Sequence, residues 1–296
     1  MSKIENKIEE QAVKTPALKT EGQAVESEQP VQHEATLFAE PIAHLGNFPI
    51  TNSLIMSWLT VLILVVALVA VNKKKKAVPR GIQNVFELLL EQALNLGDTI
   101  TGERKKTERF LPIVLTLFLF ILISNWLGLL PGVGTIGFIE GEGAHRVFVP
   151  FLRGGTADLN TTLAFALFAV VMSHIFGVIS VGAWRQLNKY INFKTLGHMI
   201  QHIKHEPLNL IVSPIKVFVG LVELVGEIAK VASLSFRLFG NIFAGEVLLA
   251  SMMAIFAYVL PLPFIFLEIF VGIIQAFIFS VLAFAFMSIA VTADEH

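Results

Sequence analysis

The chain contains no cysteine and few charged residues. None of its 296 residues is Cys, and only 15% are Asp, Glu, Lys or Arg, against about 25% in typical soluble domains. The absence of cysteine excludes disulfides, cysteine–zinc sites, iron–sulfur clusters and thiol nucleophiles. The formal net charge of −1 lacks the basic excess that is typical of nucleic-acid binding, so we expect no nucleic-acid partner.

Several motifs of soluble enzymes are also missing. The sequence contains no Gly-rich phosphate loop, no HExxH motif and no convincing serine nucleophile arrangement. We therefore expect no cofactor, no metal site and no nucleotide chemistry on this chain. His198, His202 and His205 share one helical face, but a basic loop facing lipid explains them better than a zinc site does.

Hydrophobic residues make up the largest part of the composition. They account for 54% of the chain, and the mean hydropathy is +0.71. A chain with so little polar surface cannot cover itself in water, which excludes an ordinary soluble enzyme. The composition predicts a protein whose solvent is largely lipid.

Five apolar segments are long enough to cross a membrane, which takes about 20 helical residues for a hydrocarbon core of about 30 Å. They cover residues 50–71, 110–130, 159–182, 208–260 and 264–291. The sequence therefore predicts an all-α polytopic membrane protein with a single membrane domain over residues 41–296. The polar segment 1–40, with four Lys and eight Glu, is predicted to be a mostly disordered tail.

Two segments depart from a simple upright helix. Within residues 81–100, apolar side chains such as Val85, Leu89 and Leu96 recur at helical spacing, which predicts an amphipathic helix. It lies at the membrane surface or against a partner, or it is a packed connector. Segment 208–260 would be about 78 Å long as one helix. It must be strongly tilted or lie partly along the surface, and with the last segment it forms a long hairpin.

The positive charges of the loops predict an orientation. Segment 72–109 carries nine Lys or Arg and segment 183–207 carries four, whereas segment 131–158 carries two. The positive-inside rule places the first and third of these loops in the cytoplasm. Five crossings then place the N-terminus outside and the C-terminus in the cytoplasm.

Ionisable side chains lie inside the last two apolar segments. A charge at the bilayer centre costs about 3 kcal/mol, so such residues are functional candidates unless they lie near the interface. Arg237 is flanked by apolar residues on both sides, and an arginine stays charged in a protein. It can hold a carboxylate in the ionised form and repel other cations. The full set is Lys216, Glu223, Glu227, Lys230, Arg237, Glu246 and Glu268.

Helical geometry arranges polar residues around Arg237. At 100° per residue, Asn241 lies about 40° from Arg237 and Glu246 about 180° from it. On the next helix Glu268 and Gln275 are about 20° apart and form one polar stripe. Glu246 and Glu268 lie on neighbouring arms of the hairpin. They either share one proton as a close pair or are solvated separately in a cavity.

These residues resemble a known family. The string RLFGNIFAGE at 237–246, together with QAFIF at 275–279, resembles subunit a of the F-type ATP synthase. FPITNS at 48–53, SNWLGLLPG at 124–132 and TADLNTTLAFAL at 156–167 are secondary matches. The resemblance covers roughly residues 37–296.

The resemblance implies an ion-translocating stator subunit in the bacterial plasma membrane. It would pack beside the c-subunit ring, with the b-subunit peripheral stalk and the remaining F1Fo subunits as further partners. Two offset half-channels would load and unload the ring carboxylates, coupling ion flow to ATP synthesis. Arg237 matches the family's essential arginine, which releases the ring proton and separates the half-channels.

The resemblance also assigns the remaining site residues. Asn241, Glu246, Glu268 and Gln275 match the outside-facing half-channel, and Asp158 and Asn160 would lie near its outer mouth. Glu223 and Ser233 match the inside-facing path. Relatives often carry His at position 268, and Glu268 leaves open whether the ion is a proton or sodium.

Three other interpretations explain the buried charges less well. A stand-alone ion channel or secondary transporter would function without a ring, but the chain lacks the internal repeats common in transporters. A membrane-bound hydrolase needs a nucleophile and a base at one depth, and only scattered Ser and His are present. An assembly scaffold would not need Arg237, Glu246, Glu268 and Gln275 together.

Overall fold

Long helices form most of the protein, as the hydropathy pattern predicts. The computed structural model describes residues 36–73, 81–140, 147–184, 186, 209–256 and 258–292. Within them, the helices of 20 residues or more are α2 (Asn52–Lys73), α3 (Ile82–Thr101), α4 (Arg104–Gly128), α5 (Leu159–Val181), α8 (Asn209–Ile255) and α9 (Pro261–Thr292). Five of them, all except α3, are long and apolar enough to cross a membrane. The prediction of an all-α polytopic membrane protein is confirmed.

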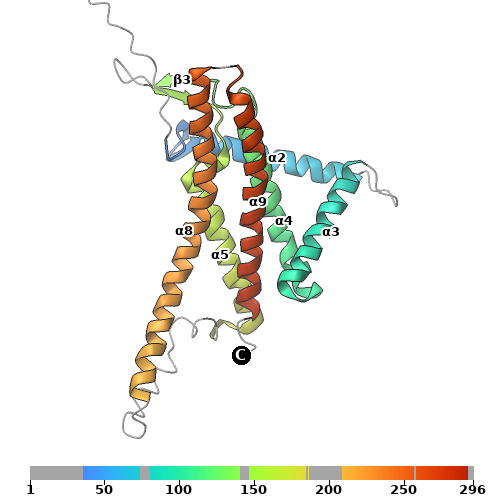
Figure 1. Ribbon diagram of the computed structural model, residues 1–296, viewed down its shortest axis with the longest axis vertical. Coiled ribbons are helices and arrows are strands. Elements are labelled where there is room, and N and C mark those ends of the chain that lie inside the picture. Colours follow the sequence, from blue (N-terminus) through green and yellow to red (C-terminus); the bar gives the residue numbers. More distant parts are fainter. Residues whose placement is uncertain are drawn as a thin grey trace, which may run out of the picture.

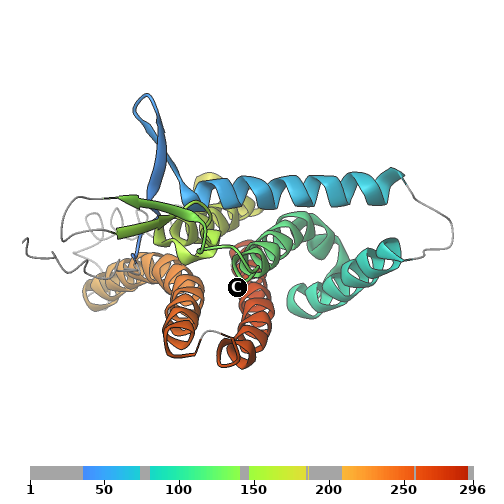
Figure 2. The same cartoon turned by 90° about the horizontal axis from the view of Figure 1, so that it is seen from above.

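Four helices pack into two layers. The α8–α9 hairpin forms the first layer, and α4 and α5 lie behind it (Figures 1 and 2). Their common core contains Ile121 from α4, Ala169 from α5, Leu238 from α8 and Phe279 from α9, all essentially inaccessible. Small residues such as Ala169 let helix backbones approach closely, which is how helices associate in lipid. The outer face of the hairpin is left uncovered by the described part of the chain.

Helix α2 lies across the other long helices (Figures 1 and 2). Its first turns bury Asn52, Ser53, Met56 and Thr60 against the bundle, and the rest of the helix projects beyond it with exposed apolar side chains. A helix that is apolar all round is typical of a membrane span. Because α2 and the hairpin cross, the two cannot both stand upright in one bilayer.

Helix α3 returns to the bundle and packs against α4 and α9. The helices approach closely at Gly97, since a Cβ there would lie 2.5 Å from Cγ2 of Thr107. The predicted apolar stripe lies partly against these helices, because Leu89, Ala93 and Leu96 line a pocket together with residues of α4 and α9. Val85 and Leu88 are exposed, and this exposure favours the membrane surface or a partner as the surroundings of that part of α3.

Helix α8 ends at Ile255 and α9 begins at Pro261. The predicted start of the last apolar segment at residue 264 is wrong, because Pro261 and Pro263 belong to the first turn of α9. Proline is tolerated in the first turn of a helix, where the backbone N–H has no intrahelical partner. The 47 residues of α8 make it about 70 Å long.

Two β-hairpins that the sequence analysis did not predict lie at one end of the bundle. Strand β1 (Pro41–Leu45) pairs with β2 (Phe48–Thr51), and β3 (Gly137–Glu140) pairs with β4 (Val147–Pro150), both antiparallel. A 3₁₀ turn, η1 (Gly155–Ala157), leads from β4 towards α5. The hairpins and η1 place polar residues over the end of α8 and α9.

Candidate functional site

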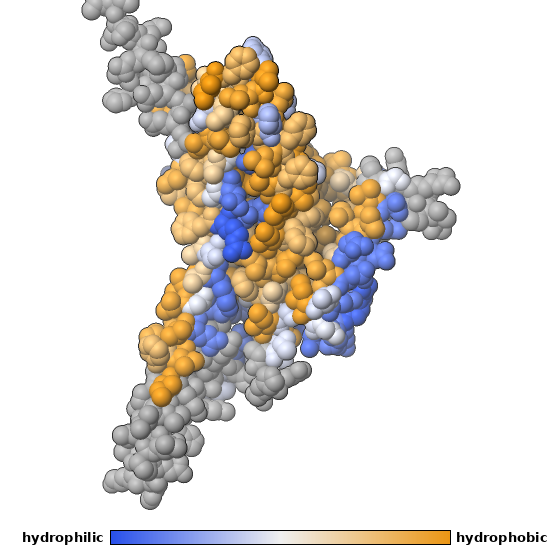
Figure 3. Space-filling view, in the orientation of Figure 1, coloured by the Kyte–Doolittle hydropathy of each residue, from blue (hydrophilic) through white to orange (hydrophobic). Residues whose placement is uncertain are grey.

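Arg237 lies on the uncovered face of α8. Its side chain is exposed, and within the described part of the chain it makes no hydrogen bond or ion pair. The surface beside it is open, because a Cβ on Gly226 or Gly240 would meet nothing within 4 Å. Hydrophilic surface runs along α8 through a face that is otherwise hydrophobic (Figure 3). The arginine is therefore a free cation in the middle of an apolar surface.

The predicted polar residues of α8 extend along this face from Arg237. Glu223, Ser233 and Asn241 each lie within about 40° of the arginine around the helix axis. Glu223 is about 21 Å from Arg237 in one direction along the helix, and Asn241 is about 6 Å from it in the other. Ser233 and Asn241 are exposed and Glu223 is half-buried. We call these four residues the polar stripe of α8. One arm of the stripe extends from Arg237 towards Glu223, and the other extends towards Asn241.

Asn241 and Gln275 meet across the hairpin, a contact that was not predicted from the sequence. The Nδ2 atom of Asn241 donates a hydrogen bond to Oε1 of Gln275 over 2.7 Å. The Gln275 side chain is buried, and its Nε2 atom has no hydrogen-bond partner among the described residues. A buried amide donor requires an acceptor such as water or a ligand carboxylate. Gln275 therefore presents a donor on α9, beside the part of α8 that carries Arg237 and Asn241.

Beyond Asn241, towards the β-hairpins, the structure contains a cavity of about 240 Å³. Glu246 of α8 and Glu268 of α9 both line it, together with Ser124 and Asn125 of α4 and the residues from Arg153 to Ala157. The sequence analysis placed these two carboxylates on neighbouring arms of the hairpin, and the structure shows that they share one cavity. Their hydrogen-bond partners differ.

Glu268 is 7% exposed and rests against the backbone of α8. A Cβ on Gly245 would lie 2.2 to 2.4 Å from its carboxyl atoms, so only glycine leaves room for this side chain. Within the described residues the Glu268 carboxyl has no hydrogen bond or ion pair. Asn125 supports α9 one turn further on by donating a 3.2 Å hydrogen bond to the carbonyl oxygen of Gly272.

Replacing Gly245 by alanine is expected to push the Glu268 carboxyl out of its position. Glu268 is flexible, so the helices should stay packed. The activity that the resemblance implies, ATP-driven ion transport, should fall by about tenfold because a group displaced by an ångström loses its reactive geometry. Transport is measured in inverted vesicles with equal amounts of assembled protein. The second substitution Glu268→Asp shortens the side chain and should restore part of the activity. Unchanged transport in the single variant would show that Glu268 does not act from this position.

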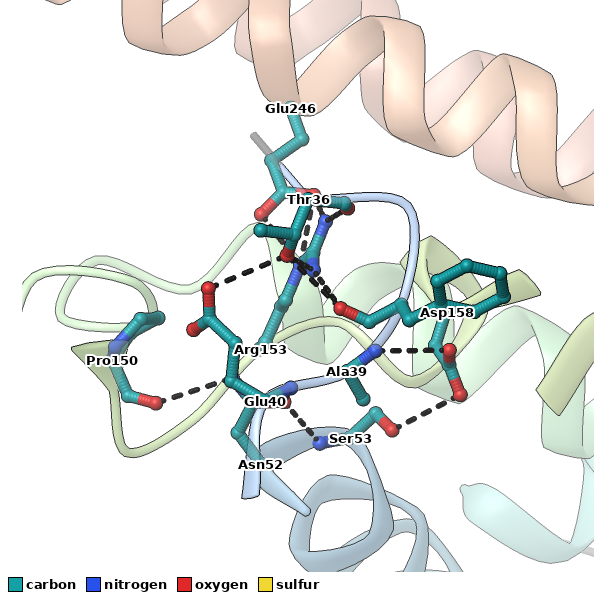
Figure 4. Close-up of polar contacts among 10 residues, drawn as sticks. Thr36, Ala39, Glu40, Asn52, Ser53, Pro150, Arg153, Asp158 and Glu246 are labelled. Carbon is teal, nitrogen blue, oxygen red and sulfur yellow. Dashed lines mark hydrogen bonds and ion pairs between the residues drawn. The ribbon is translucent and has the colours of Figure 1, made fainter. Parts of the chain in front are cut away.

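Glu246 instead forms an ion pair with Arg153, which precedes η1 (Figure 4). The guanidinium donates from Nε to both carboxylate oxygens at 3.1 and 3.2 Å, and from Nη2 to Oε2 at 3.0 Å. Arg153 is 4% exposed and also donates to the Thr36 hydroxyl and to the backbone carbonyls of Thr36 and Phe38. It therefore connects α8 with the segment that precedes β1.

We call residues 36–40 the strap. Asp158 binds its other side by accepting a hydrogen bond from the Ala39 N–H at 3.1 Å (Figure 4). The Asp158 carboxylate also accepts from the hydroxyls of Ser53 and Thr161 and from the first N–H groups of α5, which makes it the N-cap of that helix. Residues 36–40, which were included in the predicted tail, are thus held over the cavity. Asp158 is an anchor of this end of the protein, and Asn160 beside it is exposed.

A cluster of charged side chains lies near the arm of the polar stripe that contains Glu223. Lys230 donates to Glu227 over 2.7 Å, and Nε2 of His174 on α5 lies 3.5 Å from the same carboxylate. Lys230 also lies 5.3 Å from the ring centroid of Phe286. These contacts hold α5, α8 and α9 together beside Glu223. The face formed by His198, His202 and His205 lies outside the described residues.

Arg153 and Asn125 were not predicted as site residues. Arg153 was counted only among the positive charges of its loop, and its partners Glu246 and Thr36 are 93 and 117 residues away in the chain. Asn125 lies in the quoted SNWLGLLPG string, but its hydrogen bonds to Gly272 and Thr156 depend on packing. The sequence signal for Asn125 was an uncharged polar side chain near the end of an otherwise apolar helix.

Comparisons with known proteins agree on one family. The sequence profile of a family described as ATP synthase A chain matches residues 54–288. A protein named ATP synthase subunit a from Syntrophobacter fumaroxidans is 33% identical over 262 residues, which cover 87% of this chain and 90% of that protein. The protein of the same name from Moorella thermoacetica is 30% identical over 249 residues, covering 83% and 94%. That from Campylobacter jejuni is 30% identical over 240 residues, covering 80% and 88%.

Proposed function

Since the chain belongs to the family of ATP synthase A chains, we propose that two halves of an ion path meet at Arg237. The arm with Glu223 and Ser233 is one half, and the arm with Asn241 together with the cavity is the other. The family's role is that of an ion-translocating stator subunit of the membrane sector, which works within the F1Fo complex and couples proton flow to ATP synthesis. A stand-alone channel or transporter is not favoured.

The unpaired cation of Arg237 carries this proposal. An uncompensated charge on a lipid-facing apolar surface is costly, so the face requires a partner that supplies a carboxylate. Open surface at Gly226 and Gly240 gives another helix room to approach α8 closely. A rotating ring of c subunits, each with a carboxyl group inside the membrane, has the required chemistry.

Arg237 then separates two proton-transfer steps. A protonated ring carboxyl that reaches the arm with Glu223 and Ser233 releases its proton towards the cytoplasm, because the approaching guanidinium stabilises the carboxylate. The carboxylate passes Arg237 and takes up a proton from the arm with Asn241 and Gln275. The fixed positive charge repels any proton that would pass directly between the arms.

The cavity that contains Glu246 and Glu268 forms the outer path in this proposal. Gln275 continues it towards Arg237 with a free amide donor. Asp158 anchors the outer mouth, and Asn160 lies at its exposed rim. The path therefore leads from the β-hairpin end of the bundle to the middle of α8.

The crossing of α2 and the hairpin suggests how the chain lies in the bilayer. An upright α2 spans the membrane, and α8 and α9 then lie strongly tilted, so that the 47 residues of α8 present a broad face to the ring. The loop charges favour an N-terminus outside the bacterial inner membrane and a C-terminus in the cytoplasm. The uncovered surfaces of α2 and α3 are available to the peripheral stalk formed by b subunits.

Cysteine cross-linking tests the proposed partner, and the chain has no cysteine that would interfere. We expect Gly240→Cys and Ser233→Cys to form disulfides with single cysteines placed along the outer ring helix of the assembled complex, because both positions are exposed beside Arg237. Ser235→Cys is the matched control, since Ser235 is 1% exposed and faces Thr162 of α5. Equal cross-linking from all three positions, or from none, would contradict this docking face.

A further inference from the structure

We propose that Arg153 is a positioning residue of the outer path, which neutralises Glu246 and leaves Glu268 as its single proton-binding station. This inference rests on the proposed function and adds a division of roles between the two carboxylates. It concerns Arg153, which lies in a loop and 93 residues before its partner Glu246.

The hydrogen bonds of Glu246 argue against a role as a proton carrier. Both of its oxygens accept from a guanidinium that is 4% exposed, at 3.0 to 3.2 Å. A proton on Glu246 would break this two-oxygen contact and leave a buried cation without its counter-charge, which is strongly unfavourable. Glu246 is therefore bound through both of its oxygens by Arg153 and acts as an anchor.

Glu268 has the opposite surroundings. It is buried, it faces the same cavity, and within the described residues nothing donates a hydrogen bond to it. The charged groups at the cavity are Glu246 from α8, Arg153 from the loop before η1 and Glu40 from the strap. Helix α4 contributes the neutral Ser124 and Asn125, and the N-cap of α5 is Asp158, which is bound to backbone N–H groups and hydroxyls. Glu40 accepts a hydrogen bond from the Thr36 hydroxyl at 3.3 Å. Glu268 is thus the buried carboxyl at this cavity that has no partner among the described residues, and it is the available acceptor for a proton.

The ion pair also sets the field at Glu268. Arg153 and Glu246 together add no net charge, so Glu268 responds to pH as a single carboxyl group instead of as half of an acidic pair. Through Thr36 and Phe38 the same guanidinium holds the strap. Loss of either charge should therefore change the proton concentration at which the outer path is loaded.

The test uses the complete complex in inverted vesicles, where the outer path opens to the lumen. ATP synthesis is driven at a fixed diffusion potential, and the lumen pH that gives half the maximal rate is measured. With Arg153→Gln, the unpaired Glu246 carboxylate faces Glu268, and the half-maximal pH should rise by about one unit. With Glu246→Gln, the unpaired Arg153 should lower it by a similar amount.

The double variant Arg153→Gln/Glu246→Gln should bring the half-maximal pH back towards that of the parent chain, because both charges are removed together. Arg153→Lys keeps the positive charge and should stay near the parent value even if the loss of the guanidinium hydrogen bonds reduces the amount of assembled complex. If Glu246→Gln abolished synthesis with a normal amount of assembled complex, or if the two single variants shifted the pH in the same direction or not at all, the proposal would be overturned. Arg237→Ala in the same vesicles tests the proposed function independently, since its effect does not depend on which carboxylate carries the proton.

Discussion

Replacing Arg237 by alanine is expected to reduce ATP-driven proton pumping by about two orders of magnitude or more, as the loss of a preorganised charge does in other active sites. Without the guanidinium, an arriving ring carboxyl keeps its proton, because no cation stabilises the carboxylate in the apolar surroundings. The passive proton leak should increase several-fold, because the charge that repels protons between the two arms is gone. Both quantities are measured in inverted vesicles that carry equal amounts of assembled complex.

Two further variants separate charge from geometry at this position. Arg237→Lys keeps a positive charge without the planar fork of donors, so it should limit the leak while pumping stays low. Phe236→Ala changes an exposed neighbour on the same helix and should leave the leak unchanged. Full pumping by the alanine variant would refute Arg237 as the separator and favour transport through another route.

Helix type and the stripe around Arg237 were predictable because both depend on local sequence. A membrane-spanning helix is predicted from the mean hydropathy of about 20 residues, so one atypical residue has little effect on the prediction. The predicted span 159–182 corresponds to α5, which ends at Val181. Helical periodicity placed Asn241 near Arg237 and Gln275 in line with Glu268, but the hydrogen bond between Asn241 and Gln275 appears only in the structure.

The β-hairpin end of the molecule was not predictable from the same signals. Strands of four or five residues, such as β1 and β2, gain their stability from pairing and not from periodicity. Asp158 binds Ala39, which lies 119 residues earlier in the chain. Contacts of such sequence separation are set by how the helices pack, so the ion pair of Arg153 and the position of the strap appear only in the structure.

The direction of α2 could not be predicted from the sequence for a related reason. Hydropathy predicts that a segment lies in the membrane but does not give its tilt. Only Asn52, Ser53, Met56 and Thr60 fix α2 to the bundle, and these few contacts at one end determine the angle at which it leaves. The sequence left open whether the long helix is tilted or lies along the surface, and the crossing in Figures 1 and 2 favours tilt.

Replacing Glu268 by glutamine is expected to have the second large effect. Glutamine has nearly the same shape, so it should fill the place beside Gly245 and leave the packing of α8 and α9 intact. It cannot bind and release a proton at neutral pH, and a lost acid–base group typically costs about two orders of magnitude in rate. We expect both ATP-driven pumping and proton-driven synthesis to fall by about this factor, with a normal amount of assembled complex.

The comparison of Glu268→Gln with Glu246→Gln distinguishes a proton carrier from an anchor within one cavity. Both substitutions remove one carboxylate and preserve its volume, but Glu246 is paired with Arg153 whereas Glu268 has no partner among the described residues. Glu268→Gln should therefore reduce transport at every pH, while Glu246→Gln should retain it with a shifted pH dependence. Glu268→Asp keeps the titratable group on a shorter side chain and should retain part of the activity. If Glu268→Gln transported protons at the parent rate, the outer path would have to run through water alone, and Glu268 would have no direct part in it.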